Sequence, residues 1–137
     1  MKLCQETIRP STISDALKAL ASTPNSTCLI AGGTDLMLDM QQGRRSPVHT
    51  LVDITSISEL NQLEIRGEEL YIGAGVVLSK IAISSLVHEH ARSLAEACSL
   101  IGGPQVRNVA TLGGNVAHAL PAADGTIAML ALDTRVL

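Results

Sequence analysis

Two double-glycine segments are the most informative feature of this sequence: Ala31-Gly32-Gly33-Thr34-Asp35 and Thr111-Leu112-Gly113-Gly114-Asn115. Each follows an apolar run. Glycine permits positive φ and lets a ligand approach the main chain without a Cβ in the way. Successive backbone N–H groups in such turns form concave sites for anions. Two of them in one small chain predict a diphosphate held between them, and hence a nucleotide cofactor.

The composition predicts a globular protein with an aliphatic core. The chain has 137 residues, of which 46% are hydrophobic and 17% are charged. That length suits one ordinary domain or two small lobes. There is no Phe and no Trp, and Tyr71 is the only Tyr. Aliphatic side chains and Met must therefore fill the core, and a flat ligand would meet aliphatic walls.

Charge and cysteine spacing exclude several classes of function. The formal net charge is -3 and the only basic pair is Arg44-Arg45, so we expect no nucleic-acid partner. Cys4, Cys28 and Cys98 are odd in number and widely spaced, which argues against a disulfide framework, a zinc site or an iron–sulfur cluster. No apolar run approaches the roughly 18 residues of a membrane span, and no secretory leader is visible. We expect a cytoplasmic protein.

The sequence pattern of residues 1–56 predicts a small α/β lobe. Apolar spacing predicts a helix over about 13–22, capped by Ser11 or Thr12, and a helical turn over 36–40. Short apolar runs at 27–31 and 50–54 predict buried strands.

From residue 57 to 137 the pattern changes to that of a second lobe. Alternating residues at 62–66 and 70–73 predict a β-hairpin around the turn 67–69. Helices are expected over 78–87 and 90–101, followed by a stretch from 102 to 115 that is neither regular helix nor strand. Residues 133–137 are expected to form a strand with no later strand to pair with. The predicted fold class is α+β, with an antiparallel sheet and helices in the second lobe.

The first segment has a functional and a structural interpretation. Backbone N–H groups of Gly32, Gly33 and Thr34 could converge on a phosphate oxygen. A tight connection after a strand is the alternative. Asp35 must then point away from the diphosphate, bind a hydroxyl group, or cap the next helix.

Alternatives also remain open for the polar residues near the second segment. Arg107 could pair with a local carboxylate. Asp124 lies in small, apolar surroundings, so its carboxylate either accepts a ribose or ribityl hydroxyl or caps a helix. His118 could be a ligand or proton donor, although a lone His beside alanines is more often a satisfied surface or core residue. No histidine has the spacing of a metal site, and no catalytic grouping can be defined.

Together these segments resemble the FAD-binding subunit or domain of the molybdenum hydroxylases, which include xanthine dehydrogenase and carbon monoxide dehydrogenase and share a p-cresol methylhydroxylase-type FAD fold. The resemblance covers nearly the whole chain. It rests on Arg9-Pro10-Ser11-Thr12, on Ala31-Gly32-Gly33-Thr34-Asp35-Leu36, on Gly103-Pro104-Gln105-Val106-Arg107-Asn108, on Thr111-Leu112-Gly113-Gly114-Asn115, on Pro121-Ala122-Ala123-Asp124 and on Leu130-Ala131-Leu132-Asp133.

The resemblance implies that FAD is the cofactor and that the chain relays electrons. Electrons from a molybdenum centre would cross iron–sulfur clusters in partner subunits and pass through FAD to NAD or another acceptor. The implied partners are a molybdopterin-binding subunit and an iron–sulfur subunit. The implied cofactor-binding residues are Ala31, Gly32, Gly33, Thr34, Asp35, Thr111, Leu112, Gly113, Gly114, Asn115 and Asp124, with no catalytic residue and no metal ligand in this chain.

The family's flavin subunits are longer than this chain by resemblance, so the sequence is expected to be an N-terminal portion, with the second lobe truncated. This leaves a second hypothesis, a non-catalytic nucleotide-binding or assembly module that is not active alone. A purely structural α/β protein is a third, which fits the composition but not the density of matching motifs.

Overall fold

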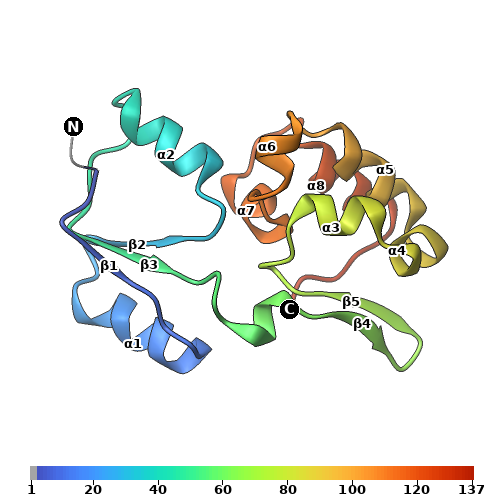
Figure 1. Cartoon of the computed structure of the whole chain (residues 1–137), viewed down its shortest axis with the longest axis horizontal. Coiled ribbons are helices and arrows are strands. Elements are labelled where there is room, and N and C mark those ends of the chain that lie inside the picture. Colours follow the sequence, from blue (N-terminus) through green and yellow to red (C-terminus); the bar gives the residue numbers. More distant parts are fainter. Residues whose placement is uncertain (1–2) are drawn as a thin grey trace.

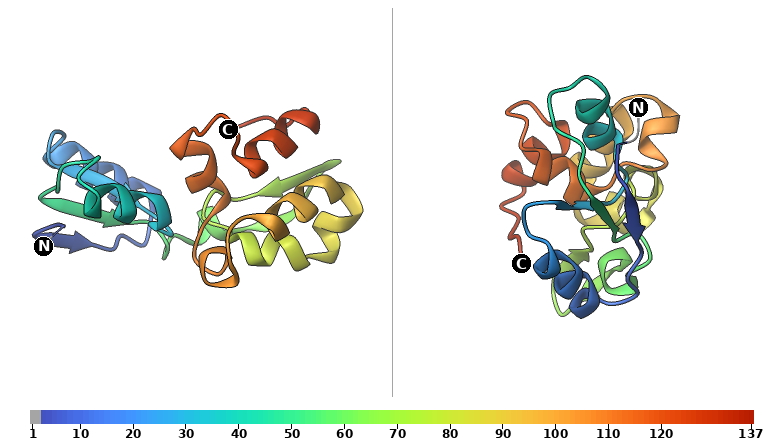
Figure 2. Two further views of the ribbon diagram at one scale, coloured as in Figure 1. Left: turned by 90° about the horizontal axis from the view of Figure 1, so that it is seen from above. Right: turned by 90° about the vertical axis from the view of Figure 1, so that its left-hand side faces the viewer.

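A three-stranded parallel sheet forms the N-terminal part of the chain in the computed structural model, which describes residues 3–137. Its elements are β1 (Glu6–Ile8), α1 (Ile13–Ser22), β2 (Thr27–Ile30), α2 (Thr34–Gln41) and β3 (Thr50–Asp53). The strand order is β1-β3-β2, and all four residues of β3 are buried. Helices α1 and α2 lie on opposite faces of the sheet (Figure 1, Figure 2). The crossovers β1–α1–β2 and β2–α2–β3 run in opposite directions across the sheet, and right-handed crossovers then place their helices on opposite faces.

Local signals and packing explain these elements. The Thr12 hydroxyl accepts a hydrogen bond from the Asp15 N–H and caps α1. Ala16, Val52 and Ile57 form a buried cluster between α1 and the sheet. The helix near 13–22 and both predicted strands are confirmed, and α2 is longer than the helical turn expected. Ile57 belongs to this cluster and Leu60 packs against it, so the packing of the first part extends beyond residue 56.

A β-hairpin and six helices form the remainder of the chain. A 3-10 turn, η1 (Ser58–Asn61), leads into β4 (Leu63–Arg66), β5 (Glu69–Ile72), α3 (Leu78–Ile83), α4 (Ser85–His90), α5 (Arg92–Leu100), α6 (Pro104–Arg107), α7 (Leu112–His118) and α8 (Asp124–Ala131). Strands β4 and β5 are antiparallel, which confirms the predicted hairpin. Figure 1 shows the helices above it.

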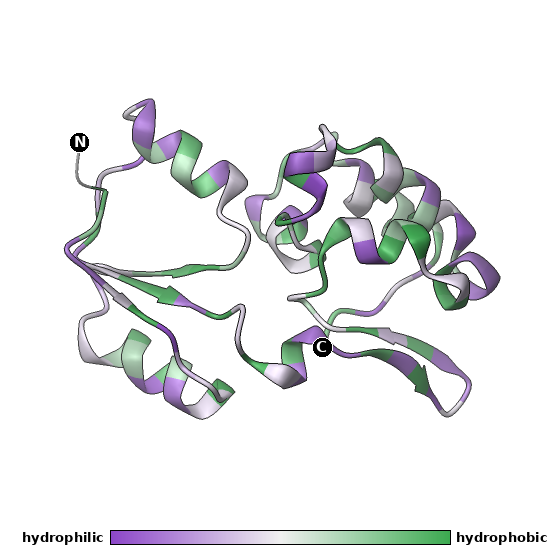
Figure 3. Cartoon of the chain, viewed as in Figure 1, coloured by the Kyte–Doolittle hydropathy of each residue, from purple (hydrophilic) through white to green (hydrophobic). Residues whose placement is uncertain are grey.

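The core of this second part is aliphatic, as predicted. Leu78, Ile81, Leu94 and Cys98 are buried there between α3, α5 and α8. Apolar side chains of the hairpin pack against them, and Figure 3 shows the apolar stretches of these helices. Among residues 3–137, no helix has both the length and the apolar character needed to cross a membrane.

Three predictions for this part are wrong. The helix expected over 78–87 is interrupted at Ser84, whose extended backbone ends α3 and whose hydroxyl caps α4. The stretch 102–115 contains α6, which begins at Pro104, a residue preorganised for a first helical position. Residues 133–137 form no strand: Asp133 has φ of +52° and Arg135 instead pairs with Glu69.

Candidate functional site

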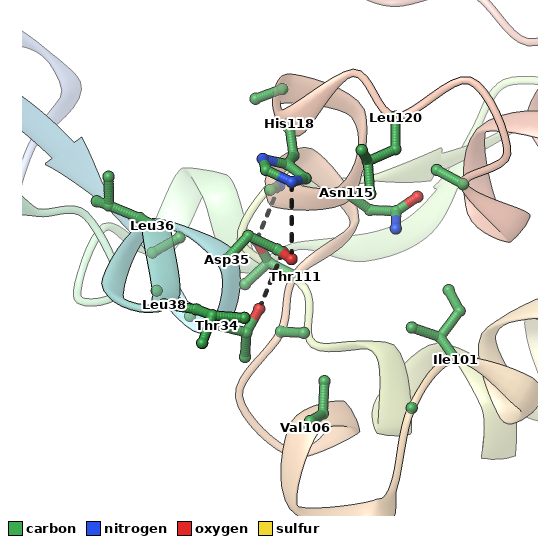
Figure 4. Close-up of a pocket in the computed structure, with 18 of the residues that line it drawn as sticks. Thr34, Asp35, Leu36, Leu38, Ile101, Val106, Thr111, Asn115, His118 and Leu120 are labelled. Atoms are coloured by element: carbon green, nitrogen blue, oxygen red, sulfur yellow. Dashed lines mark hydrogen bonds and ion pairs between the residues drawn. The ribbon is translucent and has the colours of Figure 1, made fainter. Parts of the chain in front are cut away.

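A cleft of about 530 Å³ lies between the two parts of the chain. Its walls come from the turn between β2 and α2, the start of α6, helix α7 and the start of α8 (Figure 4). Nine of the eleven residues expected to hold the cofactor line it: Ala31, Gly32, Gly33, Thr34, Asp35, Thr111, Gly114, Asn115 and Asp124. Leu112 and Gly113 do not. Segments some 80 residues apart in sequence therefore meet at one site.

The first double-glycine segment presents unpaired N–H groups to this cleft. Gly33 has φ of +70° and is the N-cap of α2, without a capping side chain. Within residues 3–137, the N–H groups from Gly32 to Leu36 have no hydrogen-bond partner, and the first helical bond runs from the Met37 N–H to the Gly33 carbonyl. The first turn of α2 therefore offers free donors at the positive end of the helix dipole, a suitable arrangement for an anion.

Gly32 has a packing role that the sequence analysis did not foresee. A Cβ added there would lie 2.0 Å from the Val109 carbonyl oxygen and 2.8 Å from the Ala110 Cα. The main chain of the first part therefore touches the main chain of the second at this residue. The missing side chain of Gly32 permits this contact between the two parts.

The second double-glycine segment is the first turn of α7 and not an open loop. Its N–H groups are already bonded: Leu112 to the Val76 carbonyl, Gly113 to the Ala74 carbonyl, Gly114 to the Thr111 hydroxyl and Asn115 to the Thr111 carbonyl. The prediction that this segment exposes free backbone donors is therefore wrong. The cause is an antiparallel contact between Val77 and Thr111 and the capping of α7 by the Thr111 hydroxyl.

Packing also explains why two predicted residues miss the cleft. Leu112 is buried in the aliphatic core. A Cβ on Gly113 would lie 2.6 Å from the Ala74 Cβ, so this glycine lets α7 approach the turn after the hairpin. Gly114 and Asn115 do face the cleft. The buried Asn115 Oδ1 has no hydrogen-bond partner in the described residues, and it lies so close to Gly125 that a Cβ there would come within 2.7 Å.

Asp124 and Arg107 resolve two of the alternatives left open by the sequence. Asp124 is the first residue of α8, and Ala123 holds the N-cap position, so the carboxylate is not the helix cap. It is exposed and free to accept a hydrogen bond in the cleft. Arg107 does not pair with a carboxylate: its guanidinium donates to the carbonyls of Ile101 and Gly102, at 3.2 and 2.5 Å, and so shapes the turn before α6.

Two polar residues outside the expected cofactor-binding set also line the cleft. His118 lines the cleft with its Nε2 3.8 Å from Asp35 Oδ1, while the Thr34 hydroxyl donates to Asp35 Oδ2 at 3.2 Å (Figure 4). Arg45 lies in the wall after α2. Neither residue could be paired with a partner from sequence alone, because their neighbours in space are distant in the chain.

A second, smaller cleft of about 370 Å³ shares Ala31, Gly32 and Thr111 with the first. It contains Asp53, the last residue of the buried strand β3. Arg9 donates to Asp53 Oδ2 at 2.8 and 2.6 Å, and the N–H and hydroxyl of Thr55 donate to Oδ1 at 2.9 and 2.6 Å. Burial alone raises the pKa of Asp53, but the hydrogen bonds from Thr55 and Arg9 outweigh it and hold that pKa below its ordinary value. This network fixes the end of β3.

Comparison with known proteins gives one consistent family. Residues 3–137 match the family model described as the FAD binding domain in molybdopterin dehydrogenase. The xanthine dehydrogenase FAD-binding subunit of Escherichia coli O157:H7 is 34% identical over 128 residues, covering 93% of this chain and 43% of that protein. The nicotinate dehydrogenase FAD-subunit of Eubacterium barkeri is 35% identical over 109 residues, covering 80% and 36%.

A solved structure shows the same fold. Carbon monoxide dehydrogenase from Hydrogenophaga pseudoflava, in a form that lacks the Mo-pyranopterin moiety of its molybdenum cofactor, matches with a TM-score of 0.84 and 34% sequence identity. The match covers 88% of this chain and 42% of that one. The expected α+β fold class is thereby confirmed. The chain spans less than half the length of these relatives.

Proposed function

Because this chain belongs to the FAD-binding domains of molybdopterin dehydrogenases, we propose that the cleft between its two parts holds the FAD diphosphate at the first turn of α2. The family resemblance and the cofactor expected from the sequence are confirmed by the family match and the FAD subunits related to it. The single observation that carries the placement of the diphosphate is the row of unpaired N–H groups from Gly32 to Leu36.

The residues present fit a dinucleotide of this kind. The free N–H groups would bind phosphate oxygens, with Gly114 and Asn115 as the facing wall. The Asp124 carboxylate would accept a hydrogen bond from a hydroxyl group of the ribityl chain. When bound, FAD supplies a redox centre that the protein's own side chains lack. The chain's part is to hold this group, to orient it and to exclude water from it.

We propose that the complete protein relays electrons from iron–sulfur clusters through FAD to NAD or another acceptor, with a molybdopterin-binding subunit and an iron–sulfur subunit as partners. The relatives are named as subunits or medium chains of dehydrogenases, which supports a multi-subunit assembly. Residues 1–56 and 57–137 would be the two FAD-binding lobes, with Ile57 packed against the first. Three free cysteines agree with the cytoplasmic location we propose.

A second candidate function is a nucleotide-binding or assembly module without redox activity of its own. One observation favours it. Tyr71, the only aromatic residue besides histidine, lies under the Arg66 guanidinium at 3.3 Å and does not line the cleft. No Phe, Tyr or Trp of this chain can therefore cover an isoalloxazine ring in the cleft.

The test of cofactor binding is a titration of the purified chain with FAD, followed by flavin fluorescence and absorbance. A matched pair of variants locates the site. Gly33→Ala and Gly43→Ala carry similar backbone strain, since φ is +70° and +73°, but a Cβ on Gly43 meets nothing within 4 Å. We expect both to lower stability and only Gly33→Ala to weaken FAD binding. Equal FAD affinity in the two variants would contradict the placement of the diphosphate.

A second experiment separates the two candidate functions. The FAD-loaded chain is mixed with a reduced molybdenum hydroxylase that lacks its flavin subunit, and flavin bleaching is followed. Bleaching supports the electron-relay subunit. Bound FAD that stays oxidised supports the nucleotide-binding or assembly module, and a chain that shows no FAD signal at all contradicts the electron-relay subunit.

A further inference from the structure

A side-chain contact between His118 and Asp35 joins the two walls of the cleft. His118 is the last residue of α7, and Asp35 lies in the first turn of α2. Their side chains are 29% and 48% exposed, with Nε2 3.8 Å from Oδ1 (Figure 4). Close by, the Gly32 main chain touches Val109. The pair therefore lies where the two parts of the chain meet.

The position of Asp35 creates an electrostatic conflict for an anion site. Its carboxylate lies on the helical turn whose N–H groups are free, so it competes for these donors and repels a diphosphate. Two more carboxylates line the cleft, Asp39 and Asp124. Asp39 is paired with Arg44 at 3.2 Å, and Asp124 lies across the cleft on α8. Of these three carboxylates, Asp35 is therefore the one that lies within the first turn of α2, beside the free N–H groups.

We infer that His118 is a positioning residue for FAD: when its imidazole carries a proton it pairs with Asp35, offsets the charge of that carboxylate and draws it away from the free N–H groups. The Thr34 hydroxyl, which donates to the other carboxylate oxygen, holds Asp35 in the same orientation. This inference rests on the proposed FAD site. His118 acts through Asp35 and need not touch the cofactor.

This inference predicts that FAD affinity depends on pH. Histidine is the side-chain type that changes charge between about pH 5 and pH 8. The other charged groups that line this cleft are Asp35 and Asp39 from α2, Arg45 after α2, and Asp124 from α8, the helix that packs beside α7. Among the other histidines, none lines the cleft. FAD should therefore bind more tightly to the protonated form of His118.

The test is the FAD dissociation constant, measured by fluorescence titration at about pH 6 and about pH 8, on either side of the histidine range. The variants are His118→Gln, Asp35→Asn and the two combined, with His90→Gln on α4 as control. For the unaltered chain we expect about two- to fivefold tighter binding at the lower pH, the size of a half-exposed ion pair. The His90 variant should behave in the same way.

The variants separate the inference from the proposed function. His118→Gln should bind weakly at both pH values, whereas Asp35→Asn and the double variant should bind tightly at both. A pH dependence that survives in His118→Gln, or an Asp35→Asn variant that binds FAD less tightly, would overturn the inference. If the unaltered chain binds no FAD at either pH, the proposed function itself fails. Circular dichroism of each variant confirms that it is folded.

Discussion

Replacing Gly32 with Ala should destabilise the protein and open the cleft. The added Cβ would lie 2.0 Å from the Val109 carbonyl oxygen, 2.6 Å from its carbon and 2.8 Å from the Ala110 Cα. A carbon and an oxygen normally approach no closer than about 3.3 Å, so the two main chains must move apart by roughly 1 Å or more. All three atoms are backbone, and no side chain can rotate to relieve the contact.

The size of the effect follows from two opposing contributions. Overpacking of this kind costs about 1–3 kcal/mol, and the severity of the contact places it at the upper end. Replacing glycine stiffens the unfolded chain and returns about 0.4–1 kcal/mol. The net loss is about 2 kcal/mol, which lowers the Tm of a chain of this length by roughly 8 °C. Because the cleft lies at this contact, FAD affinity should fall as well.

The assay is thermal unfolding followed by circular dichroism, with Gly114→Ala as the matched control. Gly114 is exposed in the first turn of α7, and a Cβ there approaches only the Thr111 hydroxyl, at 3.0 Å. Alanine is the better helix former, so we expect a Tm change of less than about 4 °C in either direction. A Gly32→Ala variant that unfolds within about 1 °C of the unaltered protein would refute the close backbone contact.

Three further predictions concern individual side chains. Asp53→Asn should lower the free energy of unfolding by about 1–3 kcal/mol at neutral pH. The pKa of Asp53 is lowered in the folded state, so its carboxylate stabilises the protein at pH values above the ordinary pKa of a carboxyl group. The Tm difference between the two proteins should therefore close as the pH falls from about 5 to about 2. Thr111→Ala should lose about 1 kcal/mol by removing the cap of α7, whereas Thr111→Ser should keep it, as chemical denaturation can measure. Burial raises the pKa of the Cys98 thiol to about 11, so a thiol reagent at about pH 8 should label Cys4 and Cys28 in the folded protein and Cys98 only after unfolding.

The first part of the fold could be predicted because its signals are local. A capping Thr12, apolar runs and a glycine after β2 each specify a helix, a strand or a turn within a few residues. The free donors at the start of α2 follow from the same local pattern, since Gly33 has no side chain that could cap the helix. The structure places this half of the predicted site in the cleft.

The second part could not be predicted to the same depth because its hydrogen bonds are long-range. The N–H groups of Leu112 and Gly113 are occupied by carbonyls of Val76 and Ala74, more than 30 residues earlier. No pattern within the segment Thr111–Asn115 reveals these acceptors. The break of the predicted helix at Ser84, in contrast, could have been predicted locally, because a serine can cap the helix that follows it.

In each double-glycine segment, one glycine therefore serves packing and the other faces the cleft. Gly32 and Gly113 have their missing side chains against main-chain atoms of Val109 and Ala74, and both close the contact between segments of the chain. Gly33 and Gly114 face the cleft, the first as the left-handed N-cap of α2 and the second as part of the opposing wall. Adjacent glycines thus serve packing and binding side by side. For this reason a single bulky substitution in either pair would not show whether weaker FAD binding comes from unfolding or from a blocked site. Four separate alanine variants, one at each glycine, would distinguish these two causes.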